Sequence, residues 1–197
     1  MRAALVGVGV IALIVLGTVV WAVGVNNQVV LADQLVSEKW AQVQNVYQRR
    51  ADLIPNLVET VKGFAAQERT VLEEVTKARA SVAGIKATPE LVNDPVALQK
   101  FERAQAELGG ALSRLLVTVE RYPDLKSNQN FLALQSQLEG TENRIAVERR
   151  RFNEAVRDYN TRLKLFPGSV VASFRGFKEK VYFEAAPGSE AAPKVKF

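Results

Sequence analysis

The chain has 197 residues, of which 48% are apolar and 24% are charged, and this balance predicts a folded domain with an appendage rather than a disordered chain. It contains no cysteine and no histidine, which excludes disulfides, thiol nucleophiles, Cys/His zinc sites and imidazole acid–base chemistry. The net charge of +5 is a weak argument for a nucleic-acid partner, because basic and acidic residues alternate along most of the chain.

Residues 3–25 form an apolar run without a charged residue. At about 1.5 Å per residue, a helix of this length crosses a hydrocarbon core of roughly 30 Å. Trp21 lies where an interfacial aromatic residue would anchor such a span. A secretory signal is the rival interpretation, because Arg2 precedes the run and residues 22–24 resemble a cleavage site, but the run exceeds the usual apolar region of about 7 to 15 residues. We therefore predict a transmembrane anchor over residues 1–27.

Three ladders of apolar residues spaced by sevens follow the anchor. The first extends from Val36 to Val82, the second from Leu98 to Tyr122, and the third from Phe131 to Phe166. This spacing gathers each set on one face of a helix, which is typical of bundle cores and coiled coils.

Prolines and capping residues mark the expected ends of these helices. Asp94 followed by Pro95 is a cap residue before a proline in the first turn, so a helix should begin near residue 95. Pro123 ends that helix, and Ser127 or Asn128 can cap the next one.

Pro55 interrupts the first ladder and leaves two alternatives. A turn at residues 52–56 gives helices of similar length and a partner for every apolar face. A single helix kinked at Pro55 keeps the heptad phase but leaves the apolar stripe at residues 36–47 facing water. We favour the turn. The predicted fold is all-α, with an N-terminal transmembrane helix, an antiparallel up-and-down four-helix bundle over residues 28–166 (helices at about 28–52, 55–84, 95–121 and 128–165) and a mostly irregular tail over residues 167–197.

Polar residues occupy ladder positions where apolar residues are expected. Either they lie at bundle ends with their side chains reaching solvent, or they form a buried polar layer that fixes the register at some cost in stability. In the second case Arg50→Leu should keep or stabilise the fold while loosening its specificity. The candidate polar layer consists of Arg50, Glu68, Gln105 and Glu148.

Two further groups are candidate interaction sites. A basic face that is either simply solvated or docks anionic headgroups or an acidic partner consists of Arg144, Arg149, Arg150 and Arg151. Aromatic residues of the tail that either pack on the bundle, lie on the membrane or bind a partner are Phe174, Phe177, Tyr182 and Phe183. From residue 185 onward, where the tail becomes rich in Ala, Pro and Gly, we expect little regular structure.

Signatures of catalysis are scarce. No phosphate-binding loop is present, and a serine triad is impossible without histidine. Carboxylates such as Glu73, Glu74 and Glu142 are best interpreted as solvated helix residues with nearby basic partners, rather than as acid–base or cation-binding groups. We predict no catalytic, cofactor-binding or metal-binding residue.

Three stretches of the chain, in order, resemble the bacterial LemA family: QRRADLIPNLVETVKGF at 48–64, LEGTENRIAVERRRFNEAVRDYNTRLKLFP at 138–167 and the tail at 176–197. The resemblance implies a single-pass membrane protein with an up-and-down four-helix bundle, and it implies no activity. The unrelated sensor kinase of the same name is a different protein. Phe64 and Phe152 stand where the family pattern leads us to expect tyrosine.

These observations favour a non-enzymatic scaffold or adaptor, anchored once in a bacterial inner membrane, that acts through protein or lipid contacts. The expected partners are membrane lipids through the anchor, an unidentified protein, and other copies in a homo-oligomer; no cofactor is expected. One alternative is a nucleic-acid-binding membrane protein, which rests on the basic balance alone. Another is an enzyme that uses carboxylates or a divalent cation.

Overall fold

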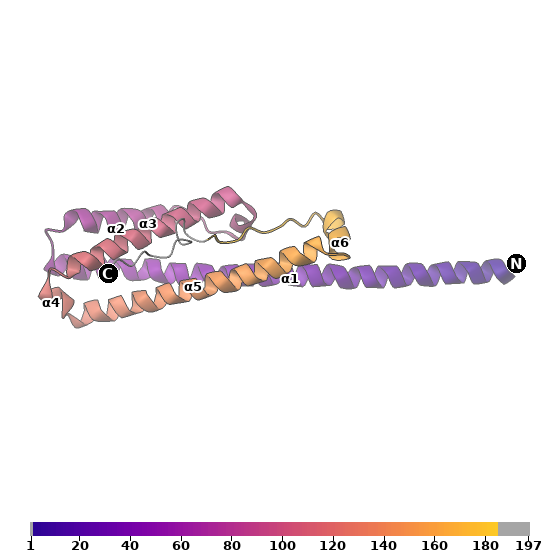
Figure 1. Cartoon of the computed structure of the whole chain (residues 1–197), viewed down its shortest axis with the longest axis horizontal. Coiled ribbons are helices and arrows are strands. Elements are labelled where there is room, and N and C mark those ends of the chain that lie inside the picture. Colours follow the sequence, from indigo (N-terminus) through magenta and orange to yellow (C-terminus); the bar gives the residue numbers. More distant parts are fainter. Residues whose placement is uncertain (1, 185–197) are drawn as a thin grey trace, which may run out of the picture. The chain divides into compact units, whose positions relative to one another are not determined.

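The structure is a computed structural model that describes residues 2–184, with the side chains of residues 2–4 left out. The Ala/Pro/Gly-rich end expected from residue 185 lies outside the described residues. Within them all regular structure is helical, so the all-α class is confirmed (Figure 1). The elements are α1 (Arg2–Phe64), α2 (Arg69–Ala83), the 3₁₀ helix η1 (Pro89–Asn93), α3 (Pro95–Val119), α4 (Pro123–Lys126), α5 (Gln129–Lys164) and α6 (Gly168–Arg175).

Two compact units divide the chain, and the long helices α1 and α5 each contribute to both. The first unit contains residues 1–47 and 144–180, which means the greater part of α1, the second half of α5, and α6. The second unit contains residues 48–143 and the chain from residue 181 onward.

The second unit is a four-helix bundle. The end of α1, then α2, α3 and the beginning of α5 alternate in direction along the chain, with α2 beside α3 (Figure 1). Apolar side chains from all four helices meet in one core, which predicts a stable bundle because burying each large side chain is worth about 1.5–3 kcal/mol. The core includes Ile54, Leu57, Val61, Leu72, Val75, Leu108, Leu115, Phe131 and Leu138.

The predicted turn at residues 52–56 is wrong, because α1 continues through Pro55 and ends at Phe64. The chain reverses instead at residues 65–68, so the predicted boundaries at 52 and 55 give way to one helix end at Phe64 and a new helix start at Arg69. The predicted end at about 84 agrees with the end of α2 at Ala83. Pro55 has no backbone N–H, so it cannot bond to the carbonyl of Ala51 one turn earlier. Arg79 of α2 supplies the missing donor, because its Nε lies 3.0 Å from the Ala51 oxygen. A long-range contact therefore compensates for the proline.

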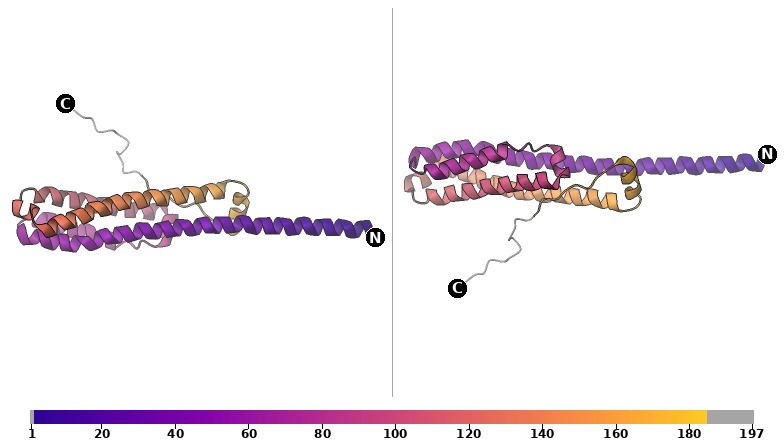
Figure 2. Two further views of the ribbon diagram at one scale, coloured as in Figure 1. Left: turned by 90° about the horizontal axis from the view of Figure 1, so that it is seen from below. Right: turned by 90° about the horizontal axis from the view of Figure 1, so that it is seen from above.

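The apolar stripe at residues 36–47 has a cover that the sequence interpretation did not anticipate. Helix α5 is 36 residues long, and within the first unit its second half lies beside α1 (Figures 1 and 2). The rings of Trp40 and Phe152 lie 5.6 Å apart between centroids, and both side chains are buried. Because α5 covers this stripe, its apolar side chains are buried although α1 continues through Pro55.

The helix starts predicted near residues 95 and 128 are confirmed, since α3 begins at Pro95 and α5 at Gln129. The carboxylate of Asp94 accepts hydrogen bonds from the backbone N–H groups of Val96 and Ala97 at 2.9 and 3.2 Å, so it caps α3. The side-chain oxygen of Asn128 accepts from the N–H of Phe131 at 3.1 Å and caps α5 in the same way.

Part of the tail that we predicted to be irregular is helical. Helix α6 begins at Gly168, where a Cβ atom would lie only 2.0 Å from the carbonyl oxygen of Arg162, so only glycine fits this close return of the chain. It ends at Gly176, whose φ of 72° lies in the left-handed region that favours glycine. The N–H groups of Gly176 and Phe177 both bond to the carbonyl of Ala172. These two glycines place a short helix directly after α5.

Candidate functional site

The most extensive exposed apolar surface belongs to the first part of α1. From Leu5 to Val23 the large apolar side chains are at least half exposed, whereas those of the bundle core are buried. This part of α1 is long and apolar enough to cross a membrane. Both views in Figure 2 show it extending beyond α5 and α6 of its own unit. This exposed run lies within residues 1–27, which we predicted to be the transmembrane anchor.

Arg50 and Gln105, two members of the candidate polar layer, meet in the interior of the second unit. Both residues are buried, with 3% and 5% of their surface exposed. The Arg50 guanidinium donates to the side-chain oxygen of Gln105, to the Gln105 carbonyl at 3.2 Å, and to the carboxylate of Glu142 at 3.0 Å. Glu142 is largely exposed, so its carboxylate is a screened partner, while Gln105 supplies the buried acceptors. Arg50 thereby ties α1 to α3 and α5.

The other two members of that layer lie elsewhere. Glu68 is partly buried at the turn before α2, where its carboxylate accepts from the hydroxyl of Tyr122 at 2.6 Å and from Arg121 at 3.1 Å. This hydrogen bond, with burial and the negative charge of Glu68, raises the pKa of Tyr122. Glu148 belongs to the first unit and pairs with Arg151 at 2.7 Å on its own helix. The four residues are therefore three separate sites rather than one layer.

The candidate basic face lies on α5, within the first unit. Arg144, Arg150 and Arg151 are exposed, while Arg149 is half-buried. Arg151 is already paired with Glu148 on its own helix. Consecutive residues of a helix lie about 100° apart, so residues 149–151 point in different directions. The exposed guanidinium groups give α5 a basic surface. We propose below that this surface contacts an anionic partner.

The four aromatic residues of the tail have different surroundings. Phe174 of α6 is 89% exposed, whereas Phe183 is buried in the second unit. Phe177 is half-buried, and Tyr182 is 39% exposed. Within the second unit the N–H of Val181 bonds to the carbonyl of Val92 at 2.9 Å, which fixes the backbone just before Phe183.

A polar cluster in the first unit was missed by sequence reasoning, because each member looks like an ordinary helix or tail residue. The carboxamide of Asn160 binds the backbone of Lys180 twice, donating to its carbonyl and accepting from its N–H at 2.9 Å each. The Lys180 ammonium lies 3.0 Å from the carboxylate of Asp33 and 5.6 Å from the ring centre of Tyr159. The Tyr159 hydroxyl donates to the carbonyl of Lys178 at 3.1 Å. This tail clamp holds residues 178–180 on α1 and α5.

The tail clamp predicts a tyrosine with an unusual titration. Burial, and then the negative charge of Asp33, raise the pKa of Tyr159 to about 12. Because the folded protein holds this proton more tightly than the unfolded chain, the stabilisation is complete below pH 10 and is lost between about pH 10 and 12. Tyrosinate absorbance of the folded protein should show a component near pH 12 among its four tyrosines, and Tyr159→Phe should remove it. Persistence of that component in the variant would assign it to another tyrosine.

Chemistry-bearing side chains do not converge within residues 2–184. No group of three or more acidic residues is placed to hold a metal ion in that part of the chain. The strongest features of the described structure are therefore an exposed apolar helix and a helical bundle with a buried arginine. These features define an all-α protein of the membrane-associated class.

The family itself is identified by comparison with known sequences. The model of the LemA family matches residues 39–197, and the chain belongs to this family. It is 29% identical over 168 residues to the Magnetosome protein MamQ of Magnetospirillum gryphiswaldense, covering 77% of this chain and 62% of that protein. It is 27% identical over 180 residues to Magnetosome protein MamQ 2 of Paramagnetospirillum magneticum, covering 83% of this chain and 66% of that protein.

A relative from a different bacterium is the Protein LemA of Metamycoplasma hominis, 20% identical over 164 residues, which cover 83% of this chain and 71% of that protein. The chain spans less than two thirds of the length of the two MamQ proteins. The family expected from the three sequence stretches is thus confirmed.

Proposed function

We propose that this protein is a single-pass membrane protein of the bacterial inner membrane, whose helical units serve as a non-enzymatic scaffold for protein or lipid contacts. The observation that carries the proposal is the continuous exposed apolar part of α1, from Leu5 to Val23, in a chain whose bundle helices share a buried apolar core. Exposure of such an apolar helical surface to water is unfavourable, whereas the hydrocarbon core of a bilayer accommodates it.

Continuity of α1 supports an anchor over a cleaved signal. The helix passes through residues 22–24, where the cleavage-like sequence lies, and extends to Phe64 without interruption. Cleavage at residues 22–24 would leave a new chain end in the middle of α1. The apolar segment therefore belongs to the same helix as the part of α1 that packs in the bundle.

A scaffold role is supported by the chemistry that the chain carries. Without cysteine or histidine it lacks the commonest nucleophile and general base of enzymes. The relatives are named as two magnetosome proteins and Protein LemA, and these names state no reaction. The exposed arginines of α5 offer contacts to an anionic surface or an acidic partner, which suits a scaffold better than a catalyst.

Alkaline extraction of bacterial membranes tests the anchor. The wild-type chain should stay in the membrane pellet, and its intact mass should include residues 1–24. Ile11→Arg combined with Val15→Arg should release it, since each charge at the centre of a span costs about 2.5–3.5 kcal/mol. Val117→Arg, which places one charge on an exposed residue of the second unit, is the control that should remain in the pellet. Release of the wild type, or loss of its first residues, would contradict the anchor.

Photo-crosslinking in the native membrane tests the scaffold. A photoreactive residue at exposed Arg150 should give a discrete protein or lipid adduct if the basic surface of α5 is a docking site. The same probe at exposed Glu74 of α2 is the control for random collisions. An identical adduct pattern at both positions, or none at either, would count against a contact role for α5.

A further inference from the structure

An apolar groove lies between α1 and α6 in the first unit, and neither the bundle nor the anchor accounts for it. Its volume is about 570 Å³. The Trp21 and Phe166 rings pack beside it with their centroids 6.0 Å apart. Most of its lining is apolar and includes Val19, Trp21, Ala22, Phe166, Val171 and Phe174; Arg175 is its cationic member.

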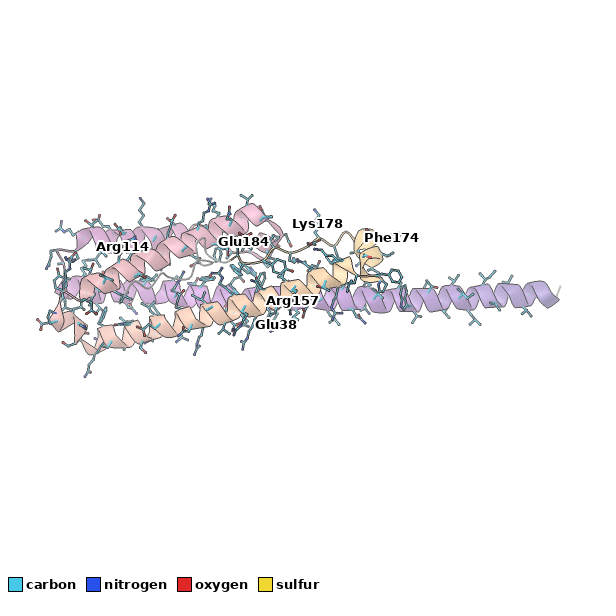
Figure 3. The ribbon with its side chains drawn as sticks, in the orientation of Figure 1. Glu38, Arg114, Arg157, Phe174, Lys178 and Glu184 are labelled. Atoms are coloured by element: carbon cyan, nitrogen blue, oxygen red, sulfur yellow. The ribbon has the colours of Figure 1, made fainter. Side chains whose placement is uncertain are left out.

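Helix α6 divides its residues among three directions. Gly168 and Ala172, four residues apart, are buried. Val170 and Phe174, also four apart, are exposed by 50% and 89% and line the groove (Figure 3 labels Phe174). At about 100° per residue, Ser173 points roughly 100° away from Phe174. A short helix with an exposed apolar face, a serine face and a terminal arginine is typical of an element that lies in a membrane interface.

The position of the groove along α1 indicates the depth at which it lies. This step rests on the proposed anchor. A span needs about 20 residues, so one that begins near Leu5 ends near Gly24. Groove residues of α1 extend from Thr18 to Asn26 and therefore straddle the boundary between hydrocarbon and headgroups. Trp21 is a residue of the kind that forms interfacial aromatic belts, and the Phe166 ring packs against it.

A phospholipid is the occupant that fits this placement. The groove is continuous with the exposed apolar surface of α1, which only acyl chains cover at that depth. Arg175 lies at the end of α6 and lines the same groove, so a cationic group stands beside an apolar slot. An acyl chain with a phosphate group attached matches this arrangement, because guanidinium groups bind phosphate oxygens in pairs.

We propose that α6 is a second membrane contact of the protein, which inserts Phe174 and Val170 into the interface beside the span. The groove between α1 and α6 holds one acyl chain of a phospholipid, and Arg175 binds the phosphate of that lipid.

Site-directed labelling of the full chain in phospholipid vesicles tests the insertion. The protein has no cysteine, so Phe174→Cys and Ser173→Cys each create a single labelling site. A fluorescent label at position 174 should be quenched several-fold more strongly by lipids with a shallow nitroxide than by a water-soluble quencher. The label at position 173, on the serine face, should show the opposite preference. Equal, water-dominated quenching at both positions would overturn the insertion.

A label at Val10→Cys separates this inference from the anchor. Quenching at position 10 by deeply placed nitroxides, together with a water-exposed label at position 174, would refute the interfacial helix and leave the span intact. Absence of quenching at position 10 would refute the proposed anchor, and the groove with it. Quenching at both positions supports both.

Native mass spectrometry of the full chain in detergent with added phosphatidylglycerol tests the groove. The wild type should retain one phospholipid. Ala22→Trp should lose it by filling the groove, whereas Val15→Trp, on the span outside the groove, should retain it. Arg175→Gln should weaken retention several-fold, and Arg175→Lys should restore part of it. Equal retention by Ala22→Trp and Val15→Trp would show that lipid binds elsewhere and would overturn the groove assignment.

Discussion

Replacement of Pro55 by alanine should stabilise the second unit by about 2 kcal/mol. A proline in a helix interior costs about 3 kcal/mol relative to alanine, because it removes one hydrogen bond and its ring crowds the carbonyl of the preceding turn. Proline also restricts the unfolded chain, which returns about 0.4–1 kcal/mol. With alanine, the N–H at position 55 reaches the Ala51 carbonyl within the helix. Urea unfolding of the chain in detergent, followed by far-UV circular dichroism, measures the difference.

The partner of this prediction is Arg79. In the wild type, Arg79→Met should destabilise the unit by about 1 kcal/mol, because the Ala51 carbonyl loses the donor 3.0 Å away. In the Pro55→Ala background the same change should cost little, since the helix then supplies the donor. The two substitutions should therefore couple, and purely additive effects would show that Arg79 does not compensate for the proline. Arg114→Met, at an exposed pair with Glu74, is the matched control with no coupling to position 55.

Gln105→Leu should destabilise the second unit by about 2–3 kcal/mol. The substitution removes a buried side-chain acceptor from the Arg50 guanidinium, and hydrogen bonds to charged groups are worth about 1.5–3 kcal/mol. The Gln105 carbonyl and the exposed carboxylate of Glu142 remain, so the loss is smaller than that of an entirely unpaired buried charge. Urea unfolding measures this loss as well.

Removal of both partners should recover most of that loss. In the Arg50→Leu and Gln105→Leu double variant the buried charge and its acceptor disappear together, and apolar residues replace them at similar volume. Glu142→Gln, at the exposed end of the cluster, should change stability by less than about 1 kcal/mol. If the double variant were less stable than Gln105→Leu alone, Arg50 would contribute more by packing than its charge costs, and the polar pair would not be the source of the effect.

Local signals in the sequence were sufficient for much of the fold. Asp94 before Pro95, and Asn128, mark helix starts because a short side chain bonds to the next turn, and the structure shows both caps. The heptad ladders predicted most of the buried residues, since the spacing alone places them on one side of a helix. Phe64 and Phe166, which also lie on the ladders, are 45% and 75% exposed. Such signals depend on neighbours within one or two turns.

The path of the chain at Pro55 depended on residues far away in sequence. The tolerance of α1 for a proline comes from Arg79, 28 positions later, and a hydrogen bond at that separation leaves no periodic trace. The cover for the stripe at residues 36–47 comes from the second half of α5, more than 100 positions later. This apolar face does have a helical partner, but the partner is α5 and not a helix created by a turn at Pro55.

The candidate sites divide in the same way. Arg50 and Gln105 were recognisable as polar residues on apolar positions, and the structure brings them together. Glu68 and Glu148 share that pattern, yet each contacts other residues, because a ladder position specifies a face and not its neighbour in space. Asn160 and Lys180 gave no signal at all, since an asparagine on a helix and a lysine in a tail are ordinary.

The tail clamp grips main-chain atoms. The hydrogen bonds of Asn160 and Tyr159 go to the peptide groups of Lys178 and Lys180, and the carboxamide offers one donor and one acceptor as a neighbouring strand would. An extended stretch is thus satisfied without a β-sheet partner. The side chains that hold this stretch belong to α5. Substitutions of Lys178 should therefore be tolerated better than substitutions of Tyr159 or Asn160.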